Sequence, residues 1–479
     1  MNKIKKLAGE TVLYGLGTIL PRTLNFFLVG LHTRIFLPDE YGVYVTLYAW
    51  IAFLNVIYLF GMETSYFRFA TKPGADEENI FRVTQTFVLA ISGFFSICII
   101  LFAHQISEPF DVVNHSEFIA WLSIVMFVDA AVAIPFARLR LEKKATKFAM
   151  AKILNILIQV GLNLYFLIVI YDPSINIGFL ILANLFANLF YVIFFFKTLT
   201  SWRPAWDKVL FSSMIRYAYP IMLTGLAGMT NEMFSRQVLG WWLPNGFYPG
   251  KTSKEALGIF GACYRFSVIM NLAVQAFKFA AEPFFFSNSS TSNSPQLFAK
   301  VNHFFTIVCC FIVLGVTINL DILQVLLGPD FREGLVIVPI LLIGYMFLGV
   351  YYNISIWFKL TDRTYFGTLI TIVGMVLTIG VNFLLIPIMG YLGSAWATLI
   401  CYLVMLAICY FLGQRYYPVP YKIVKGILYL LLALILIQIS KYLELPNQIA
   451  STLLHAFTMT VYLAIAYWSE KKYWLGSID

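Results

Sequence analysis

The chain has 479 residues, of which 60% are hydrophobic, 17% aromatic and 12% charged, and its mean hydropathy is +0.80. Soluble domains carry about 25% charged residues, so the composition excludes an ordinary soluble domain. The high aromatic content excludes intrinsic disorder. Apolar runs of about 20 residues, rather than alternating segments of about 10, exclude a transmembrane barrel. The composition therefore predicts an all-α polytopic membrane protein.

Fourteen apolar stretches are long enough to cross a bilayer, because a transmembrane helix needs about 20 such residues. They leave little of the chain for a soluble domain. In chain order the expected spans are 11–37, 42–70, 80–104, 117–140, 148–171, 176–198, 213–242, 255–284, 297–325, 334–358, 364–388, 391–414, 422–441 and 449–469.

Basic residues are distributed unevenly over the connecting loops. Of the 33 Lys and Arg, five lie inside spans, 24 lie at the termini and after even-numbered spans, and four lie on the other side. Because basic residues are retained in the cytoplasm, this pattern predicts that both termini are cytoplasmic. The net charge of +9 is thus a topology signal, and no nucleic-acid partner is expected. The first span is expected to be a retained helix rather than a signal peptide.

An internal repeat relates the two halves of the chain. Arg140-Leu141 and Gly161-Leu162-Asn163 match Lys359-Leu360 and Gly380-Val381-Asn382 at a constant offset of 219 residues. A further match, at an offset of 216, pairs Tyr41-Gly42-Val43-Tyr44 with Leu257-Gly258-Ile259-Phe260. In transporters, such duplication places the substrate site between two lobes. We expect a lobe over 1–205, a second lobe over 206–418, and two additional helices over 419–479.

Charged residues inside the spans are the candidates for function, because a charge in hydrocarbon costs about 2.5–3.5 kcal/mol. Arg22 follows about 16 Å of helical rise into the first span and shares one helix face with Asn25. Arginine binds anionic oxygens through parallel hydrogen bonds. The candidate anion-binding residues are Arg22, Asn25, Arg236, Arg265 and Lys278.

Carboxylates and one histidine within the spans are candidates for coupling to H+ or Na+. Asp129 is the strongest of these because of its depth, and the others are Glu63, Glu232 and His32. Structural roles stay open: His32 would serve as a packing residue, and Glu232–Arg236 and Lys278–Glu282 would pair along one helix. Asp129 could also neutralise Arg22 or Arg265.

The six cysteines all lie in apolar runs and lack metal-binding spacing, so they are expected to be core residues. No zinc motif, nucleophilic triad or nucleotide fold is evident, so we expect no enzyme activity, no metal and no cofactor beyond a coupling ion. The segment from Asn245 to Thr252 approximates a phosphate-binding loop, but its first glycine is missing and no strand precedes it. We interpret that segment as a turn.

The segment Leu37-Pro38-Asp39-Glu40-Tyr41-Gly42-Val43-Tyr44, followed by Phe60-Gly61-Met62-Glu63 and Arg68, resembles the Wzx-type oligosaccharide flippases of the MOP superfamily. The resemblance spans the chain. It implies alternating-access transfer of an undecaprenyl-diphosphate-linked oligosaccharide across the bacterial inner membrane, for surface polysaccharide biosynthesis. It further implies that lobe arginines and lysines hold the diphosphate, that aromatic residues contact sugars, and that membrane lipid and a polysaccharide polymerase complex are partners.

Three other functions stay open. A lipid II flippase would share the fourteen helices and a cationic cavity, whereas the Leu37–Tyr44 segment favours the oligosaccharide branch. A MATE-type drug exporter would need an acidic midplane, against which Arg22 and Arg265 argue. A membrane glycan polymerase would need a large outer loop, yet the longest loop runs only from Leu243 to Lys254.

Overall fold

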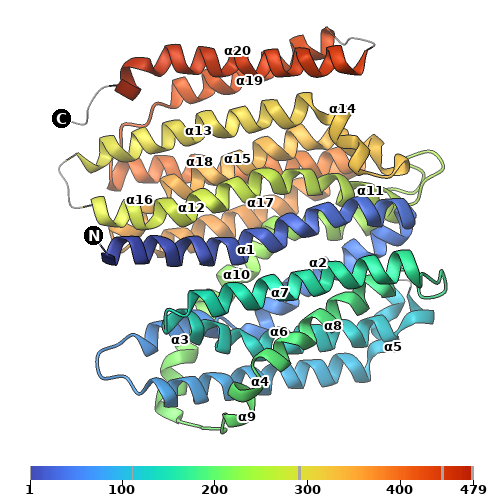
Figure 1. Ribbon diagram of the computed structural model, residues 1–479, viewed down its shortest axis with the longest axis vertical. Helices are drawn as coiled ribbons and strands as arrows, with labels where there is room; N and C mark the ends of the chain where they lie inside the picture. The colour runs from blue at the N-terminus through green and yellow to red at the C-terminus, as the bar shows by residue number, and fades with distance from the viewer. Residues whose placement is uncertain (1, 111, 290–292, 444–446, 476–479) are drawn as a thin grey trace. The chain divides into compact units, whose positions relative to one another are not determined.

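The computed structural model describes residues 2–110, 112–289, 293–443 and 447–475, with backbone alone at 2–14, 16, 280, 283, 287 and 472–475. Within this part of the chain the secondary structure is helical and contains no strand (Figure 1). Twelve helical segments of the described residues are long and apolar enough to cross a membrane. The two remaining expected spans correspond to α1, a helix of 34 residues, and to α8, an apolar helix of 17 residues. The expected helical membrane fold is confirmed.

The first half of the chain contributes ten α-helices that run back and forth, with most connections short. In chain order they are α1 (Asn2–Ile35), α2 (Pro38–Leu59), α3 (Met62–Ala70), α4 (Glu77–Leu101), α5 (Ala103–Ser107), α6 (Glu117–Leu141), α7 (Ala145–Leu164), α8 (Gly178–Phe194), α9 (Phe196–Ser201) and α10 (Lys208–Trp242).

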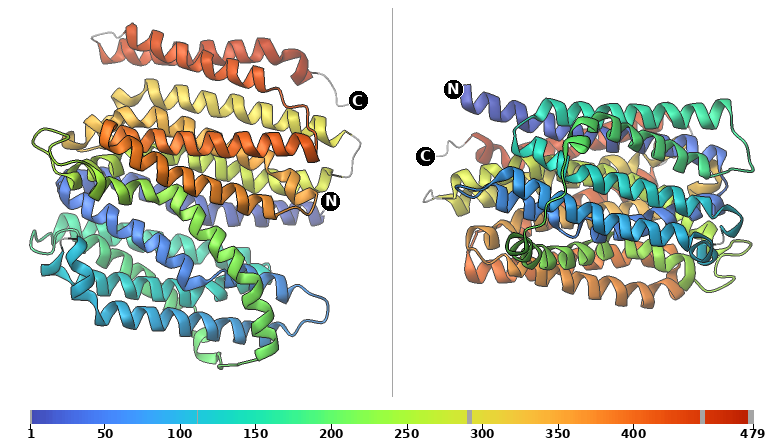
Figure 2. Two further views of the ribbon diagram at one scale, coloured as in Figure 1. Left: turned by 180° about the vertical axis from the view of Figure 1, so that it is seen from behind. Right: turned by 90° about the horizontal axis from the view of Figure 1, so that it is seen from below.

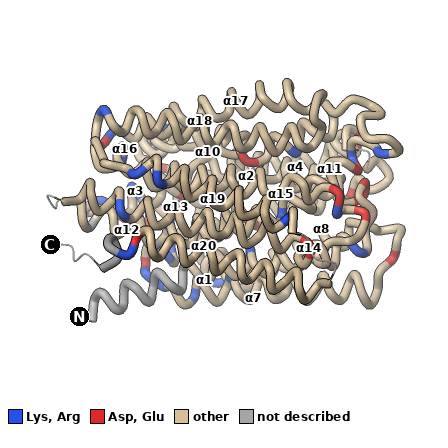
Figure 3. The backbone as a smooth tube through the Cα atoms, turned by 90° about the horizontal axis from the view of Figure 1, so that it is seen from above, with Lys and Arg blue, Asp and Glu red and all other residues tan. Residues whose placement is uncertain are grey.

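The second half repeats this pattern and ends in two further long helices. Its helices are α11 (Ser253–Tyr264), α12 (Val268–Asn288), α13 (Ser294–Ile318), α14 (Leu320–Leu323), α15 (Val338–Ile354), α16 (Ile356–Leu360), α17 (Tyr365–Met389), α18 (Tyr391–Tyr416), α19 (Ile423–Tyr442) and α20 (Gln448–Leu475). Lys and Arg lie mostly toward helix ends, and long central stretches carry no charge (Figure 3).

The packing divides the chain into two compact units. The first comprises residues 1–261 and 378–390, and the second comprises residues 262–377 and 391–479. The division differs from the expected lobe boundary because α10 packs against α2 and α3. In addition, the last part of α17 bonds to α10. The lobe boundaries drawn from the repeat stay a prediction.

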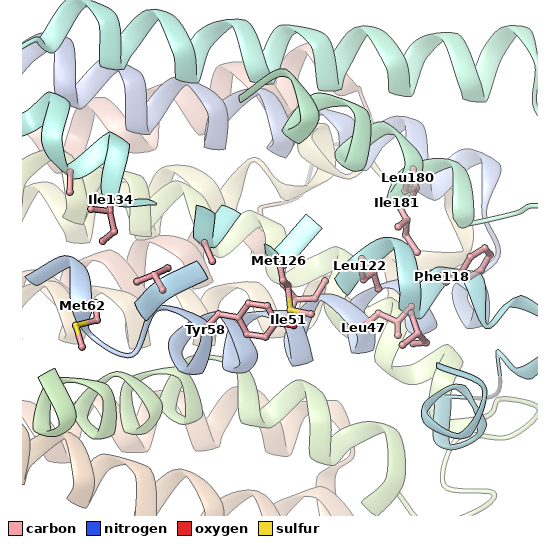
Figure 4. Close-up of a cluster of buried hydrophobic side chains, with 14 of the residues drawn as sticks. Leu47, Ile51, Tyr58, Met62, Phe118, Leu122, Met126, Ile134, Leu180 and Ile181 are labelled. Atoms are coloured by element: carbon pink, nitrogen blue, oxygen red, sulfur yellow. The ribbon is translucent and has the colours of Figure 1, made fainter. Parts of the chain in front are cut away.

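A break in the second span shapes the first unit. Phe60 and Gly61, between α2 and α3, both have positive φ, at 50° and 71°. A Cβ at Gly61 would lie 2.7 Å from the carbonyl oxygen of Ala218 on α10, so both the turn and the close approach require glycine. Tyr58 before this break and Met62 after it are fully buried in one apolar cluster with residues of α6 and α8 (Figure 4).

Two glycines of the repeat meet where α2 crosses α11. A Cβ at Gly42 would lie 2.2 Å from the Lys254 carbonyl oxygen, and a Cβ at Gly258 would lie 1.8 Å from that of Pro38. No side chain fits at such distances, so the crossing depends on both glycines. The glycine pair that the repeat predicted as equivalent positions is thus one contact in the structure.

In the second unit, α19 and α20 pack beside α13 (Figure 2). A buried polar cluster joins them. The carboxylate of Glu470 on α20 accepts hydrogen bonds from Lys425 Nζ at 2.7 Å and from Tyr429 OH at 3.1 Å, both on α19. The ring of His303 on α13 lies 3.2 Å from the same carboxylate oxygen. Since His303 and Glu470 are each about 1% exposed at the side chain, this ion cluster holds the last two helices on the unit.

Candidate functional site

Asp129 lies at the centre of a polar network inside the first unit. Asn188 on α8 donates to the Asp129 carboxylate at 3.0 Å, and Asn155 on α7 donates to Asn188 at 3.3 Å. Lys152 on α7 interacts electrostatically with Asp129, and its ammonium group lies 4.2 Å from the centre of the Phe136 ring. The sequence left open whether Asp129 neutralises Arg22 or Arg265; in the structure, Lys152 is the cation that acts on its carboxylate.

Glu63, in the first turn of α3, pairs with Arg140 near the end of α6. The Arg140 guanidinium also lies 5.0 Å from the centre of the Phe67 ring, which holds it in a cation–π contact. Lys152 is within electrostatic range of Glu63 as well. The first unit therefore carries two cations and two carboxylates in one connected cluster.

The second unit carries an equivalent ion pair. Glu282 on α12 pairs with Lys359 on α16. In both pairs the two partners are 77 residues apart, and each partner is displaced from its counterpart by the 219 residues of the repeat. The carboxylate of Glu282 therefore bonds across to α16, whereas the sequence left open a pair with Lys278 one turn away on the same helix.

Lys278 lines a pocket within the second unit. Its ammonium group lies 4.3 Å from the centre of the Tyr352 ring, and Lys359 and Glu282 both act on it electrostatically. The pocket has a volume of about 140 Å3 and contains all three charged side chains. Its aromatic lining comes from Phe285, Tyr351, Tyr352 and Phe358.

The repeat is also visible in two helix contacts of the first unit. His32 on α1 is buried, and its ring nitrogen Nε2 lies 3.0 Å from the side-chain oxygen of Asn163 on α7. The side-chain amide nitrogen of Asn163 donates to the carbonyl oxygen of Gln159, four residues earlier. Asn382 on α17 makes the same backward bond and donates to Ser235 on α10 at 3.1 Å. His32 is thus placed between helices, and its role in ion coupling stays a prediction.

The remaining predicted site residues lie on three elements. Arg22 is exposed on α1 and Asn25 is half-buried one turn later. Glu232 and Arg236 are half-buried on α10, where the Arg236 guanidinium donates to the sulfur of Met233 at 3.0 Å. Arg265 is half-buried in the 3₁₀ turn Arg265–Ser267 that joins α11 to α12. Their roles toward a ligand stay predictions.

Sequence reasoning missed Arg140, Lys152 and Lys359, because it counted them as basic residues of loops and span ends. The structure places each inside a helix and in contact with a carboxylate or an aromatic ring. A signal for two of them was available. The offset of 219 that aligns Arg140 with Lys359 also aligns Glu63 with Glu282.

The chain belongs to the polysaccharide biosynthesis protein family, whose model matches residues 31–333. A search of curated proteins finds no match. The resemblance noted from the sequence is therefore confirmed at the level of the family.

Three solved structures of transporters are similar to this chain. The chain is similar to the lipid II flippase MurJ in an inward closed conformation, with a TM-score of 0.76 at 13% identity over 96% of this chain and 99% of that one. It is also similar to an inward-facing multidrug resistance MATE transporter of the MOP superfamily, with a TM-score of 0.64 at 12% identity, over 85% of this chain and 97% of that one. The similarity to a Vibrio cholerae MATE transporter has a TM-score of 0.58 at 14% identity, over 86% of this chain and 96% of that one. The chain therefore shares the fold of these three transporters.

Proposed function

We propose that this protein flips an undecaprenyl-diphosphate-linked oligosaccharide from the cytoplasmic to the outer leaflet for surface polysaccharide biosynthesis. The observation that carries the proposal is the combination of a polysaccharide biosynthesis family with a fold that matches a lipid II flippase over nearly the whole chain. Such a reaction moves the substrate by alternating access and neither makes nor breaks a covalent bond, so the protein would not be an enzyme.

Intramembrane cations suit the diphosphate of such a substrate. Arg22, Arg236 and Arg265 can each offer a planar pair of N–H donors to phosphate oxygens, whereas Lys278 offers a point charge. Asn25 would add a neutral donor beside Arg22. We assign these five residues to substrate binding.

Energy for transport would come from an H+ or Na+ gradient or from consumption of the product. Asp129 is our first candidate for the coupling carboxylate, because it is linked through Asn188 and Lys152 to two neighbouring helices. Glu63, Glu232 and His32 are further candidates. We place the protein in the bacterial cytoplasmic membrane with both termini inside, from the distribution of basic residues.

The sidedness of the lipid-linked intermediate tests this function. After depletion of the protein, inner-leaflet lipid-linked oligosaccharide is expected to accumulate, as measured with a membrane-impermeant sugar-labelling reagent on oriented vesicles. Accumulation of the peptidoglycan precursor instead would favour the lipid II flippase alternative. Unchanged sidedness of both lipids would contradict a flippase and favour drug export or an enzymatic role.

The substitution Arg22→Ala tests the anion-binding assignment. Export is expected to fall by about tenfold or more, because the substitution removes a charge-assisted bidentate contact, while expression and membrane insertion persist. Export at the wild-type level would remove Arg22 from the site. Arg34→Ala is a matched control, since Arg34 is also exposed on α1 but off the polar face.

A further inference from the structure

A second, larger pocket lies in the second unit, at the end of α13 that leads into α14 (Figure 1). Its volume is about 790 Å3, which is in the range of small-molecule sites. Its walls come from α13, α14, the 3₁₀ segment Pro329–Ile337, the start of α15, the end of α19 and the start of α20. The ion cluster of Glu470 lies in the opposite halves of α13, α19 and α20, so the two features are separate.

Three buried polar atoms on residues that line this pocket have no hydrogen-bond partner in the described part of the chain. They are Thr317 Oγ1, Ser440 Oγ and His455 Nδ1, on residues that are 3%, 2% and 6% exposed. Buried polar groups are nearly always paired, because an unpaired group loses its bonds to water without replacing them. Three such atoms, contributed to one pocket by α13, α19 and α20, indicate a ligand with hydrogen-bonding groups.

The ring of His455 lies between a hydroxyl and a carboxylate of the pocket. Its Nε2 lies 3.4 Å from Ser451 Oγ, and its Nδ1 lies 3.8 Å from Asp321 Oδ1. A hydroxyl that donates to Nε2 leaves the proton of the neutral ring on Nδ1. At 3.8 Å this N–H is too far from Asp321 for a hydrogen bond, so both groups keep bonding capacity for a ligand. The Asp321 side chain is 41% exposed and therefore accessible.

The charges of this pocket balance. Among the described residues that line it, Asp321 is the one carboxylate and Lys441 the one lysine or arginine. A ligand that carries an ammonium group and an anionic oxygen satisfies both. The described lining contains no Phe, Tyr or Trp, so it offers a sugar ring no such aromatic face. The remaining polar lining consists of hydroxyl and amide groups, from Thr317, Ser440, Ser451, Gln324 and Gln448. This composition favours a zwitterion over a simple ion or a sugar.

The surface beside the pocket is apolar. Val336 lines the pocket and is 53% exposed, while Tyr442 and Ile449, adjacent in sequence to lining residues, are 89% and 71% exposed. Because α13, α19 and α20 are long and apolar enough to cross a membrane, their ends lie at the level of lipid headgroups. The distribution of basic residues predicts that these ends face outward. A polar pocket with apolar surroundings at this level fits an amphipathic ligand.

We propose that this pocket binds the headgroup of an outer-leaflet phospholipid of the phosphatidylethanolamine type, as a resident lipid distinct from the cargo. The primary ammonium of the lipid bonds Asp321, and its phosphate bonds Lys441 and His455 Nδ1. The hydroxyls of Thr317 and Ser440 donate to further oxygens of the headgroup. The acyl chains lie along the exposed apolar residues of α19 and α20. The bound lipid thereby joins α13 and α14 to the last two helices.

Lipid selectivity tests this assignment. Purified full-length protein, delipidated in detergent, is titrated with dioleoylphosphatidylethanolamine, and binding is measured as a rise in melting temperature. We expect about tenfold weaker binding of dioleoylphosphatidylcholine, whose quaternary ammonium has no N–H to donate, and of dioleoylphosphatidylglycerol, which has no ammonium. Equal affinity for the three lipids, or no binding of any of them, would overturn the proposal.

Charge variants locate the binding in this pocket. Asp321→Asn and Lys441→Gln are each expected to weaken phosphatidylethanolamine binding about tenfold. Asp330→Asn is a matched control that should bind as the wild type, because Asp330 is exposed on the neighbouring 3₁₀ segment and does not line the pocket. Wild-type affinity in both pocket variants would overturn the assignment.

Hydroxyl variants separate a ligand contact from a structural role. Without lipid, Thr317→Val and Ser440→Ala are expected to melt at or above the wild-type temperature, because each removes an unpaired buried hydroxyl. Both should nevertheless bind phosphatidylethanolamine more weakly than the wild type. Lower melting without lipid, together with wild-type lipid affinity, would assign the hydroxyls to the fold and overturn their role in binding.

A final arm separates a lipid from a soluble zwitterion. Glycerophosphoethanolamine, which is the headgroup without acyl chains, is expected to compete with the lipid only at far higher concentration. Competition at the same concentration as the lipid would assign the pocket to a soluble ligand and overturn the lipid proposal.

Discussion

The ion pairs Glu63–Arg140 and Glu282–Lys359 occupy equivalent positions of the repeat, yet their surroundings differ. Beside the first pair, Lys152 and Asp129 add one charge of each sign, so the cluster is balanced. Beside the second pair lies Lys278, which adds a positive charge. Among the described residues that line its pocket, no carboxylate besides Glu282 balances it. The duplicated ion pair thus joins two helices in each half, while the charges that surround it differ between the halves.

Removal of a repeat-matched glycine is expected to have the largest effect. Gly258→Ala places a Cβ within 1.8 Å of a backbone oxygen, so the α2–α11 crossing must open, and we expect a loss of about 3 kcal/mol or more in stability. Thermal unfolding in detergent, followed by size-exclusion fluorescence, measures this loss. Gly161→Ala is the control, because a Cβ there meets nothing within 4 Å. Similar melting of both variants would show that the crossing can relax.

The buried Glu470 cluster should rank second. Glu470→Gln removes the buried carboxylate that Lys425 and Tyr429 donate to and that the His303 ring contacts. Since the Lys425 side chain is 42% exposed, we expect a loss of about 2 kcal/mol in stability. The same assay is expected to show a lower melting temperature, and limited proteolysis should release α19 and α20 first. Glu117→Gln, at an exposed pair, should leave the melting temperature unchanged. A Glu470→Gln protein as stable as wild type would show that this cluster does not hold the last helices.

The balance of charge in the first unit can be tested by a double-mutant cycle. Lys152→Gln is expected to destabilise the protein by on the order of 1–2 kcal/mol, because Asp129 loses its nearby cation. Asp129→Asn in the same chain should restore part of that loss. Additive losses would contradict the coupling. Lys147→Gln on the same helix, where the side chain is exposed, serves as control.

A loop ion pair should give the smallest effect. Glu142 follows α6, and partial burial would raise the pKa of its carboxyl, but hydrogen bonds from Lys144 and Arg138 outweigh burial and hold that pKa below its usual value. The pair therefore contributes stability above the unfolded pKa of about 4.3, and this contribution is lost as pH falls through the lowered folded pKa.

For exposed pairs this contribution is about 0.2–1 kcal/mol. Melting of wild type and Glu142→Gln between pH 7 and pH 3 is expected to converge at low pH. A constant difference at every pH, or one that persists in high salt, would contradict an electrostatic origin.

Much of the helical fold could be predicted from the sequence, because hydrophobic length sets the membrane spans. Twelve of the fourteen expected spans correspond to helical segments of the described residues that are long and apolar enough to cross a membrane. Gly42 and Gly258, which the repeat aligns, lie in contact where α2 crosses α11. The break at Phe60 and Gly61 was not predicted. Apolar residues continue on both sides of it, so periodicity alone does not reveal where a helix turns.

Composition by itself determined the class of protein, since 60% hydrophobic residues in long runs can satisfy their backbone only as membrane helices. It also identified Lys278, Asp129 and Glu63 as charges that need partners. Which partners they have was decided only by the tertiary structure, because Lys152, Arg140 and the Tyr352 ring reach them from other helices. Spacing along one helix predicts contacts within that helix, whereas contacts across helices depend on how the helices pack.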